Sequence, residues 1–184
     1  MDTIRHARLA DAEALAAIYA PAVRDAATSF ELVPPTAAEL AARVAAIQAW
    51  APWLVLERAG QVVGYAYAAR HRDRPAYQWS VDVSVYVADA AQRTGVGRAL
   101  YDRLLPMLRD QGFCVAHAGI TLPNPASVRL HEACGFTPVG VYPAVGWKLG
   151  AWHDVGWWRR PLRPPDPTVA PAPPGPPAAA IPPG

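Results

Sequence analysis

The residues best suited to chemistry form a glycine-containing loop near the middle of the chain, Gln92-Arg93-Thr94-Gly95-Val96-Gly97. Before the loop, valines alternate with polar residues over 81–87, which predicts a half-buried β-strand. After the loop, leucines recur at helical spacing as far as residue 108. A helix begins with unpaired N–H groups and partial positive charge, and glycines let a ligand approach the backbone closely. The junction therefore favours an anion such as a pyrophosphate.

Two common phosphate-binding patterns do not match this junction. No Gly-Lys-Ser/Thr follows for a P-loop, and the third glycine of the dinucleotide-binding pattern is missing. A glycine pair alone also occurs in ordinary tight turns. The loop gains specificity from a second segment about thirty residues downstream, NPASVRLHEACGF at 124–136.

Together the two segments resemble the Q/R-x-x-G-x-G/A and N-x-x-S-x-x-L-x-E-x-x-G-F motifs of the GNAT superfamily of N-acetyltransferases. The resemblance implies an α/β (α+β) fold whose mixed, mostly antiparallel central sheet is flanked by helices. It implies acetyl-CoA as the acetyl donor, with the following contacts: Val85, Tyr86, Val87, Gln92, Arg93, Thr94, Gly95, Val96, Gly97, Arg98 and Asn124. For Asn124 a plain helix N-cap is the other interpretation, and the two are compatible.

Three more segments resemble the phosphinothricin and methionine sulfoximine N-acetyltransferase family: ATSFE at 27–31, YQWSVD at 77–82, and VGWKLGAWHDVGWW at 145–158. The resemblance covers nearly all of residues 4–160. Members acetylate the α-amino group of phosphinothricin, methionine sulfoximine or methionine sulfone, so it implies a small-molecule amine as acceptor. It also places Arg72, Asp73 and Arg74 in a substrate-contacting loop, where cations would suit a carboxylate or phosphinate. A solvated hairpin end is the alternative for each. Leu149 stands where a histidine is common.

Acetyl transfer to an amine needs a base, because the amine is mostly protonated at neutral pH. Asp82 is the candidate base. The family usually has Glu there, and the aspartate is shorter by about 1.5 Å, which favours a bridging water. His131 is the candidate acid for the departing thiolate, or the base instead. A free N–H at Val85 or Val87 could polarise the thioester carbonyl. The alternatives are a solvated or Arg-paired strand aspartate and a packed helix histidine.

Other functions remain open at this stage. The same fold and donor would serve a polyamine, an antibiotic amine or a protein N-terminus as acceptor. A non-catalytic acyl-CoA sensor would also keep the glycine loop. Turnover separates the sensor from the enzymes, and the acceptor profile separates the enzymes from each other.

The elements that must position these residues follow from periodicity and turn signals. Strands are predicted at 4–8, 53–58, 61–71, 77–87, 113–120, 136–148 and 152–159, and helices at 11–20, 36–50, 95–111 and 124–135. Pro21 is predicted to end or kink the first helix and Pro106 to kink or break the third. A single domain, 1–160, precedes a proline-rich segment, 161–184, which is predicted to be a disordered tail.

Composition limits the class of protein. The chain has 184 residues, 52% hydrophobic, with a formal net charge of +2. The sequence shows no concentrated basic face of the kind that binds nucleic acid. No run of residues reaches the ~18 apolar residues that a membrane span needs. Two cysteines and a polar N-terminus indicate a reducing cytoplasm. Five histidines without metal-site spacing predict no metal. Family analogy and the aromatic-rich C-terminal strands predict a homodimer.

Overall fold

The computed structural model describes residues 2–164, 166, 168–179 and 181. Within these residues seven strands form one sheet in the order β1-β2-β3-β4-β5-β7-β6. The strands are β1 (Thr3–His6), β2 (Trp53–Arg58), β3 (Gln61–Arg70), β4 (Ser80–Val87), β5 (Val115–Leu122), β6 (Thr137–Lys148) and β7 (Ala151–Pro161). Neighbours are antiparallel, except that β4 and β5 run parallel. The predicted mixed, mostly antiparallel sheet is confirmed.

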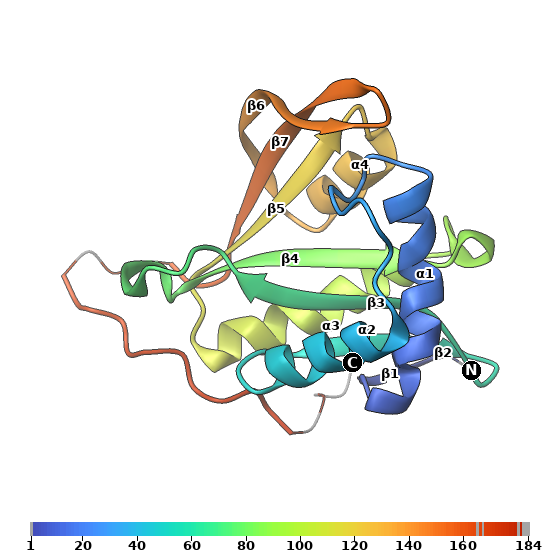
Figure 1. Cartoon of the computed structure of the whole chain (residues 1–184). Coiled ribbons are helices and arrows are strands. Elements are labelled where there is room, and N and C mark those ends of the chain that lie inside the picture. The colour runs from blue at the N-terminus through green and yellow to red at the C-terminus, as the bar shows by residue number, and fades with distance from the viewer. Residues whose placement is uncertain (1, 165, 167, 180, 182–184) are drawn as a thin grey trace.

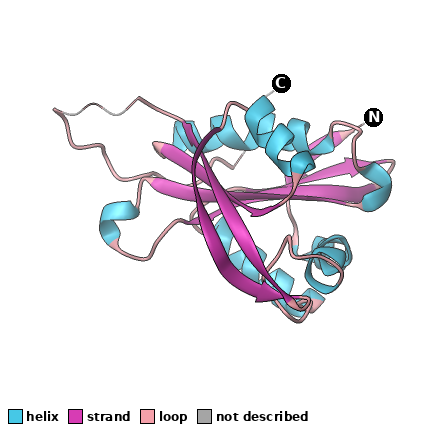
Figure 2. Cartoon of the chain, turned by 90° about the horizontal axis from the view of Figure 1, so that it is seen from above, coloured by secondary structure: helices cyan, strands magenta, loops and turns pink. Residues whose placement is uncertain are grey.

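Helices cover both faces of this sheet (Figures 1 and 2). They are α1 (Ala12–Arg24), α2 (Ala37–Gln48), α3 (Val96–Gln111) and α4 (Pro125–Ala133), with short 3-10 turns η1 (Leu9–Asp11), η2 (Pro75–Tyr77) and η3 (Asp89–Ala91). Helices α1 and α2 pack together on one face, α3 packs on the other, and α4 lies beside β5. Among the described helices, none is long and apolar enough to span a membrane.

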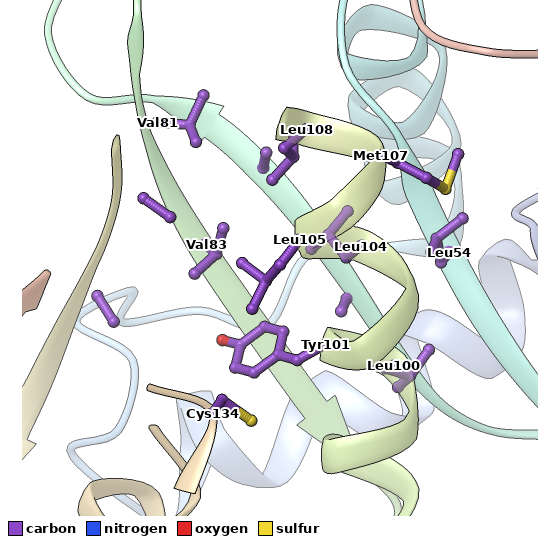
Figure 3. Packing of buried hydrophobic residues seen from close by; sticks show 14 of the residues in the cluster. Leu54, Val81, Val83, Leu100, Tyr101, Leu104, Leu105, Met107, Leu108 and Cys134 are labelled. Atoms are coloured by element: carbon purple, nitrogen blue, oxygen red, sulfur yellow. The ribbon is translucent and has the colours of Figure 1, made fainter. Parts of the chain in front are cut away.

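Helix α3 supplies much of the core through one continuous apolar face. Five of its residues are at most 1% exposed: Leu100, Tyr101, Leu104, Leu105 and Leu108. Figure 3 shows this face packed against Val81 and Val83 of β4. Burying one such leucine side chain contributes roughly 1.5–3 kcal/mol. The packing therefore fixes the start of α3 relative to β4.

The sheet opens between its two parallel strands. β4 pairs with β5 only where Ser80–Asp82 meets Val115–His117. Beyond that point β5 keeps its full antiparallel pairing with β7, which extends to Leu122. In Figure 1 β5 and β7 rise together away from β4. The rest of β4, from Val83 to Val87, therefore has β3 on one side and an opening on the other.

Two prolines that were predicted to end or kink helices lie inside them. Helix α1 continues past Pro21 to Arg24, and α3 continues past Pro106 to Gln111. A proline inside a helix removes one N–H bond and crowds the preceding turn. Burial of Val23 (1% exposed) and Leu108 (0%) in the turns that follow offsets this cost. The prediction that α1 ends near Ala20 is therefore wrong, because packing outweighs local propensity.

The proline-rich segment forms no helix or strand after Pro161 in its described part, yet it contacts the domain. The N–H of Leu162 donates to the carbonyl of Cys114 at 2.8 Å, and the N–H of Gly175 donates to the carbonyl of Gln111 at 2.7 Å. The indole N–H of Trp79 donates to the Ala172 carbonyl at 2.9 Å. Residues 165, 167, 180 and 182–184 lie outside the described part, and the disorder of the segment in solution stays a prediction.

Candidate active site

A cleft of about 770 Å³ occupies the opening between β4 and β5. One wall is β4 from Val83 to Val87, and the opposite wall is β5 from Gly119 to Thr121. The start of α3, helix α4 and the end of α1 close its other sides. The fold thus brings the glycine loop and the Asn124 segment, which the sequence singled out separately, into one site.

The start of α3 lies at one end of the cleft. Of the predicted loop contacts, the cleft is lined by Gln92, Arg93, Gly95, Val96, Gly97 and Arg98. Gly95 takes a left-handed conformation (φ +86°), and its carbonyl accepts the first helical bond, from Ala99, at 2.9 Å. The N–H groups of the first helical turn therefore have no partner within the helix. Oriented N–H groups with a helix dipole behind them suit phosphate oxygens.

Gly97 lets helices α3 and α4 approach each other at this end. A Cβ atom built on Gly97 would lie 3.0 Å from Cδ2 of Leu130, which is closer than an ordinary contact. The glycine is therefore required for packing as well as for ligand access.

Thr94 and Arg98 stabilise the loop by contacts with the protein itself. The Thr94 hydroxyl donates to the Ala91 carbonyl at 2.7 Å and accepts from Arg58 at 3.1 Å, and Thr94 is not among the residues lining the cleft. The Arg98 guanidinium pairs with Asp102 and donates to the Ala133 carbonyl at 2.8 Å. Their predicted contacts with acetyl-CoA stay predictions.

The open edge of β4 offers backbone donors to the cleft. The N–H of Ala88 donates to the Val63 carbonyl on β3 at 2.9 Å. Successive residues of a strand turn their N–H groups to opposite sides, so Val87 and Val85 turn theirs toward the cleft. Tyr86 lines the cleft, but its ring packs edge-on against Tyr19 at 4.7 Å. Both valine amides thus remain candidates for polarising a thioester carbonyl.

Asn124 caps α4 and also lines the cleft. Its Oδ1 accepts the N–H of Ser127 at 3.0 Å, which caps α4. The residue also lines the cleft, and the described residues give its amide nitrogen no hydrogen-bond partner. The amide can therefore donate to a ligand while it caps the helix.

His131 is held through both ring nitrogens at the cleft wall. Nδ1 lies 2.8 Å from the Ser127 carbonyl, so this nitrogen carries a proton and donates it. Nε2 lies 3.0 Å from the hydroxyl of Tyr101, which also borders the cleft. Burial lowers the pKa of His131 and raises that of Tyr101 well above its usual value. In the neutral pair, Nε2 accepts and the tyrosine carries the only O–H proton. Tyr101 escaped sequence reasoning because it reads as one more apolar position of α3.

Asp82 does not line the cleft but lies just behind its inner end. It pairs with His117 across the strands at the last point before β4 and β5 separate. The next residues on the same face, Ser84 and Gly119, line the cleft. Asp82 Oδ1 lies 2.7 Å from Nδ1 of His71. Burial raises the pKa of Asp82, while the bond to His71 opposes the shift.

His117 completes a polar cluster with His71 and Asp82. The two imidazole rings stack with centroids 4.3 Å apart and 19° between planes. His117 Nδ1 is buried without a hydrogen-bond partner among the described residues, and burial lowers the pKa of this histidine to about 4. One potential ligand atom from each residue lies within 4.8 Å of the others. The expectation of no metal rested only on the spacing of the histidines along the chain. Folding brings together residues that lie far apart in the sequence. The stacked rings face each other, whereas metal ligands turn their nitrogens toward a shared centre.

The loop after β3 places only Arg72 near this cluster. Its Nη1 donates to the His71 carbonyl at 2.6 Å, and its guanidinium carbon lies 5.8 Å from the centre of the Trp157 ring. Asp73 and Arg74 are exposed on the same loop. None of the three lines the cleft, so their contact with substrate stays a prediction.

The segment between α1 and α2 lines the outer part of the cleft and is fixed by polar contacts that range from buried to exposed. Tyr19 bonds to Ser29 at 2.6 Å and to Glu31 at 2.9 Å, and Glu31 pairs with Arg43. Lys148, only 5% exposed, donates from β6 to the Ser29 carbonyl. Ser29, Glu31 and Lys148 belong to the segments 27–31 and 145–158 that the sequence singled out, but no spacing along the chain shows that they meet.

The fold and cleft together define an acyl-CoA-dependent transferase. Residues 4–157 match the family described as the acetyltransferase (GNAT) domain, and the chain belongs to that family. The predicted fold, family and acetyl-CoA-dependent N-acetyltransferase activity are confirmed.

The chain is similar to particular members of this family. It is 43% identical to phosphinothricin N-acetyltransferase of Streptomyces viridochromogenes over 164 residues, 89% of this chain and 90% of that protein. It is 40% identical to L-methionine sulfoximine/L-methionine sulfone acetyltransferase of Salmonella typhimurium, covering 83% of this chain and 90% of that protein. A crystal structure of a phosphinothricin acetyltransferase from Sinorhizobium meliloti with acetyl-CoA superimposes with a TM-score of 0.86 at 34% identity, covering 93% of both chains.

Proposed function

We propose that this enzyme transfers acetyl from acetyl-CoA to the α-amino group of a small amino-acid analogue of the phosphinothricin, methionine sulfoximine or methionine sulfone type. One observation carries the proposal: a single cleft runs from the start of α3, which suits an anion, into the opening between β4 and β5. The names of relatives at 43% and 40% identity supply the acceptor class. Blocking the amino group of phosphinothricin would make the enzyme a resistance determinant.

The donor side of the cleft fits the parts of acetyl-CoA. The N–H groups at the start of α3 would hold the pyrophosphate. The Asn124 amide would donate to the pantetheine arm, and the amides of Val85 and Val87 lie along the path to the acetyl group. Each is a backbone or amide donor fixed by the fold, so no reorganisation is needed when negative charge develops on the carbonyl oxygen.

The acceptor side suits a small, acidic amino acid. Small or short side chains border it, from Ala22, Ala26, Thr28, Ser84 and Gly119. Arg72 lies behind this region over Trp157 and would attract a carboxylate or phosphinate. A cation at this end disfavours polyamines and aminoglycosides, which carry positive charge themselves.

Two separate groups of residues would carry out the two proton transfers, one to the departing thiolate and one from the acceptor amine. The Tyr101–His131 pair lines the donor half of the cleft and would supply the proton for the departing thiolate. Asp82 would serve the acceptor amine through His71 or a water, because its carboxylate lies behind the lining residues. Transfer then proceeds directly between two bound substrates, which removes the entropy cost of their encounter.

We also propose a homodimer that uses β6 and β7. β6 is an edge strand, and apolar residues are exposed on β6, on the turn after it and at the start of β7: Val139, Val141, Tyr142, Val145, Trp147, Leu149 and Trp152. Trp147 and Trp152 are 58% and 62% exposed. Such a patch on an edge strand indicates a protein interface. Light scattering should give a dimer for the wild type and a monomer for Trp147→Ser/Trp152→Ser. A monomeric wild type at tens of micromolar would contradict the proposal.

A cytoplasmic location fits the state of the cysteines. Cys114 and Cys134 are both free thiols, and Cys134 is buried. Free thiols are typical of reducing compartments.

The test of the proposed function is thiol release from acetyl-CoA with a panel of acceptors. Phosphinothricin, methionine sulfoximine and methionine sulfone should be turned over, whereas spermidine, an aminoglycoside and an N-terminal peptide should not. Turnover of a polyamine or peptide alone would replace the acceptor class. Tight acetyl-CoA binding without any turnover would favour a non-catalytic sensor.

A further inference from the structure

The polar cluster behind the cleft has a donor–acceptor order that points to a proton acceptor other than Asp82. Asp82 Oδ1 and His71 Nδ1 are 2.7 Å apart, and their side chains are 27% and 15% exposed. An ionised carboxylate only accepts hydrogen bonds, so Nδ1 carries the proton in this contact. The lone pair of a neutral His71 is then on Nε2.

The other ring nitrogen of His71 is available. The described residues give Nε2 no hydrogen-bond partner, and it is not among the buried atoms that lack one. His117 Nδ1 is the opposite case, since it is buried and without a partner. Of the two histidines in the cluster, His71 therefore combines a fixed tautomer with a nitrogen that a substrate or water can reach, and His117 does not.

Packing holds the His71 ring in place. His117 stacks on one face at 4.3 Å, while Trp157 and Tyr77 stand edge-on at 6.0 and 5.8 Å. Gly119 has no Cβ, and the Trp157 ring fills that space, with atoms 3.3–3.5 Å from the position a Cβ would take. The neighbouring elements thus restrict the ring to an orientation set by Asp82.

We propose that His71 is the general base of this enzyme and that Asp82 orients and polarises it. This deepens the proposed function and rests on it. The short Asp82 side chain leaves room for the imidazole that bonds to it at 2.7 Å. Asp82 and His117 lie one residue pair behind Ser84 and Gly119, about 7 Å along the strands, so His71 acts on the amine through water.

The proton and electron balance is complete without another reactant. One proton passes from the substrate ammonium group to His71 Nε2. The freed electron pair of the nitrogen forms the N–C bond, and the C–S bond breaks with its pair on sulfur. The second proton lost by the nitrogen ends on that sulfur, by way of the Tyr101–His131 pair. The proton on His71 is released to solvent, so transfer yields one amide, one thiol and one proton.

Several ionisable groups lie around this cluster. They are Asp82 on β4, His117 on β5, Arg159 on β7, Arg72 beside the His71 ring and Tyr77 of η2. Burial keeps His117 neutral near pH 7, so it adds no charge to the stack. Asp82 is the only acid in this set, which makes it the group that stabilises a protonated His71.

The test compares His71→Asn, which keeps a donor for Asp82 but has no second ring nitrogen, with His71→Ala. Acetyl-CoA dissociation constants should stay within about twofold in both variants. The expected loss in kcat is on the order of 10²-fold or more. Added imidazole should restore turnover by at least tenfold in His71→Ala, and Asp82→Glu in that background should also restore part of it. A structural role would not give rescue by a small base.

Each outcome decides one point. If His71→Asn keeps kcat within about threefold of the wild type, the proposal is wrong, and the proposed function stands. If the wild type acetylates none of the amino-acid analogues but acetylates another amine, the proposed function fails, and His71 is tested on that amine. If EDTA abolishes wild-type turnover and Zn²⁺ restores it, the cluster is a metal site and the base assignment is overturned.

Discussion

His131 Nε2 lies 3.0 Å from the Tyr101 hydroxyl, so a polar contact joins α4 to α3 at the wall of the cleft. The proposed protonation of the departing thiolate therefore involves both residues. The tyrosine holds the O–H proton, and the histidine fixes its direction. This contact converts the sequence prediction for His131 into a prediction about a pair.

Tyr101→Phe and His131→Ala should therefore have similar effects on the chemical step. Each should lower the single-turnover rate by about 10²-fold, with acetyl-CoA affinity nearly unchanged. Tyr65→Phe is the control, because Tyr65 is equally buried and lies away from the cleft lining. His131→Ala also leaves the buried Tyr101 hydroxyl without its hydrogen-bond partner, which costs about 1–3 kcal/mol of stability. If the double variant regains that stability and all three variants turn over normally, the pair is only structural.

Gly97→Val should weaken acetyl-CoA binding. Its side chain would meet Leu130 and narrow the cleft at the helix start, since even a Cβ comes to 3.0 Å. We expect the dissociation constant measured by calorimetry to rise at least tenfold. Gly140→Val is the matched control, because a Cβ there meets nothing within 4 Å. Equal acetyl-CoA affinities in the two variants would show that the pyrophosphate does not bind at the start of α3.

Much of this site was predictable because its signals are local. The strand–glycine–helix junction and the Asn124 cap depend on residues within a few positions of each other, and both form as predicted. The capping box of Thr36 and Glu39 forms in the same local way. These features follow from hydrogen bonds that a short segment makes with itself.

What sequence reasoning missed depends on contacts between distant segments. His71 and His117 stack only because β4 and β5 pair at their first residues, and β5 leaves β4 because β7 holds it. Lys148 of β6 donates to the carbonyl of Ser29, in the segment between α1 and α2, and these two residues also lie far apart in the sequence. No spacing along the chain encodes these contacts. The two helix-internal prolines show the same rule, since burial beyond them decides where the helices end.

Lys148→Met should loosen the segment between α1 and α2 without affecting the donor side. The ammonium group donates to the carbonyls of Ser29 and Ala22, which the thioether cannot replace. We expect KM for the amino-acid acceptor to rise several-fold while the acetyl-CoA dissociation constant stays constant. Arg24→Met, which removes an exposed pair with Asp25, is the control. An unchanged acceptor KM would show that the segment does not shape the acceptor site.

Acid should destabilise the protein partly through His117. Burial lowers its pKa to about 4 in the folded chain, against about 6.5 when unfolded. The unfolded state therefore binds the extra proton, and stability falls as pH drops from about 6.5 to 4. Urea unfolding of His117→Val should show a smaller loss over that range than the wild type. His6 and His131, whose pKa values burial also lowers, should keep part of the loss. If the free energy of unfolding depends on pH in the same way for the wild type and His117→Val, His117 is not buried in its neutral form.

Removing residues from Arg163 onward should lower Tm modestly and leave turnover unchanged. The described part of this segment bonds to Trp79 and Gln111, and Ile181 packs against the core. Each 1 kcal/mol lost should shift Tm by about 2–4 °C. Described residues of the segment do not line the cleft. Trp79→Phe should reproduce part of the shift. An unchanged Tm in both variants would support a disordered tail.

The most direct test of the account is a competition experiment on the purified enzyme. Acetyl-CoA is supplied below the total acceptor concentration, with phosphinothricin, methionine sulfone, glutamate and spermidine present in equal amounts. Mass spectrometry then identifies each acetylated product. The account predicts acetyl groups mainly on the α-nitrogen of phosphinothricin and methionine sulfone. Acetyl groups mainly on spermidine, with the amino-acid analogues untouched, would contradict it.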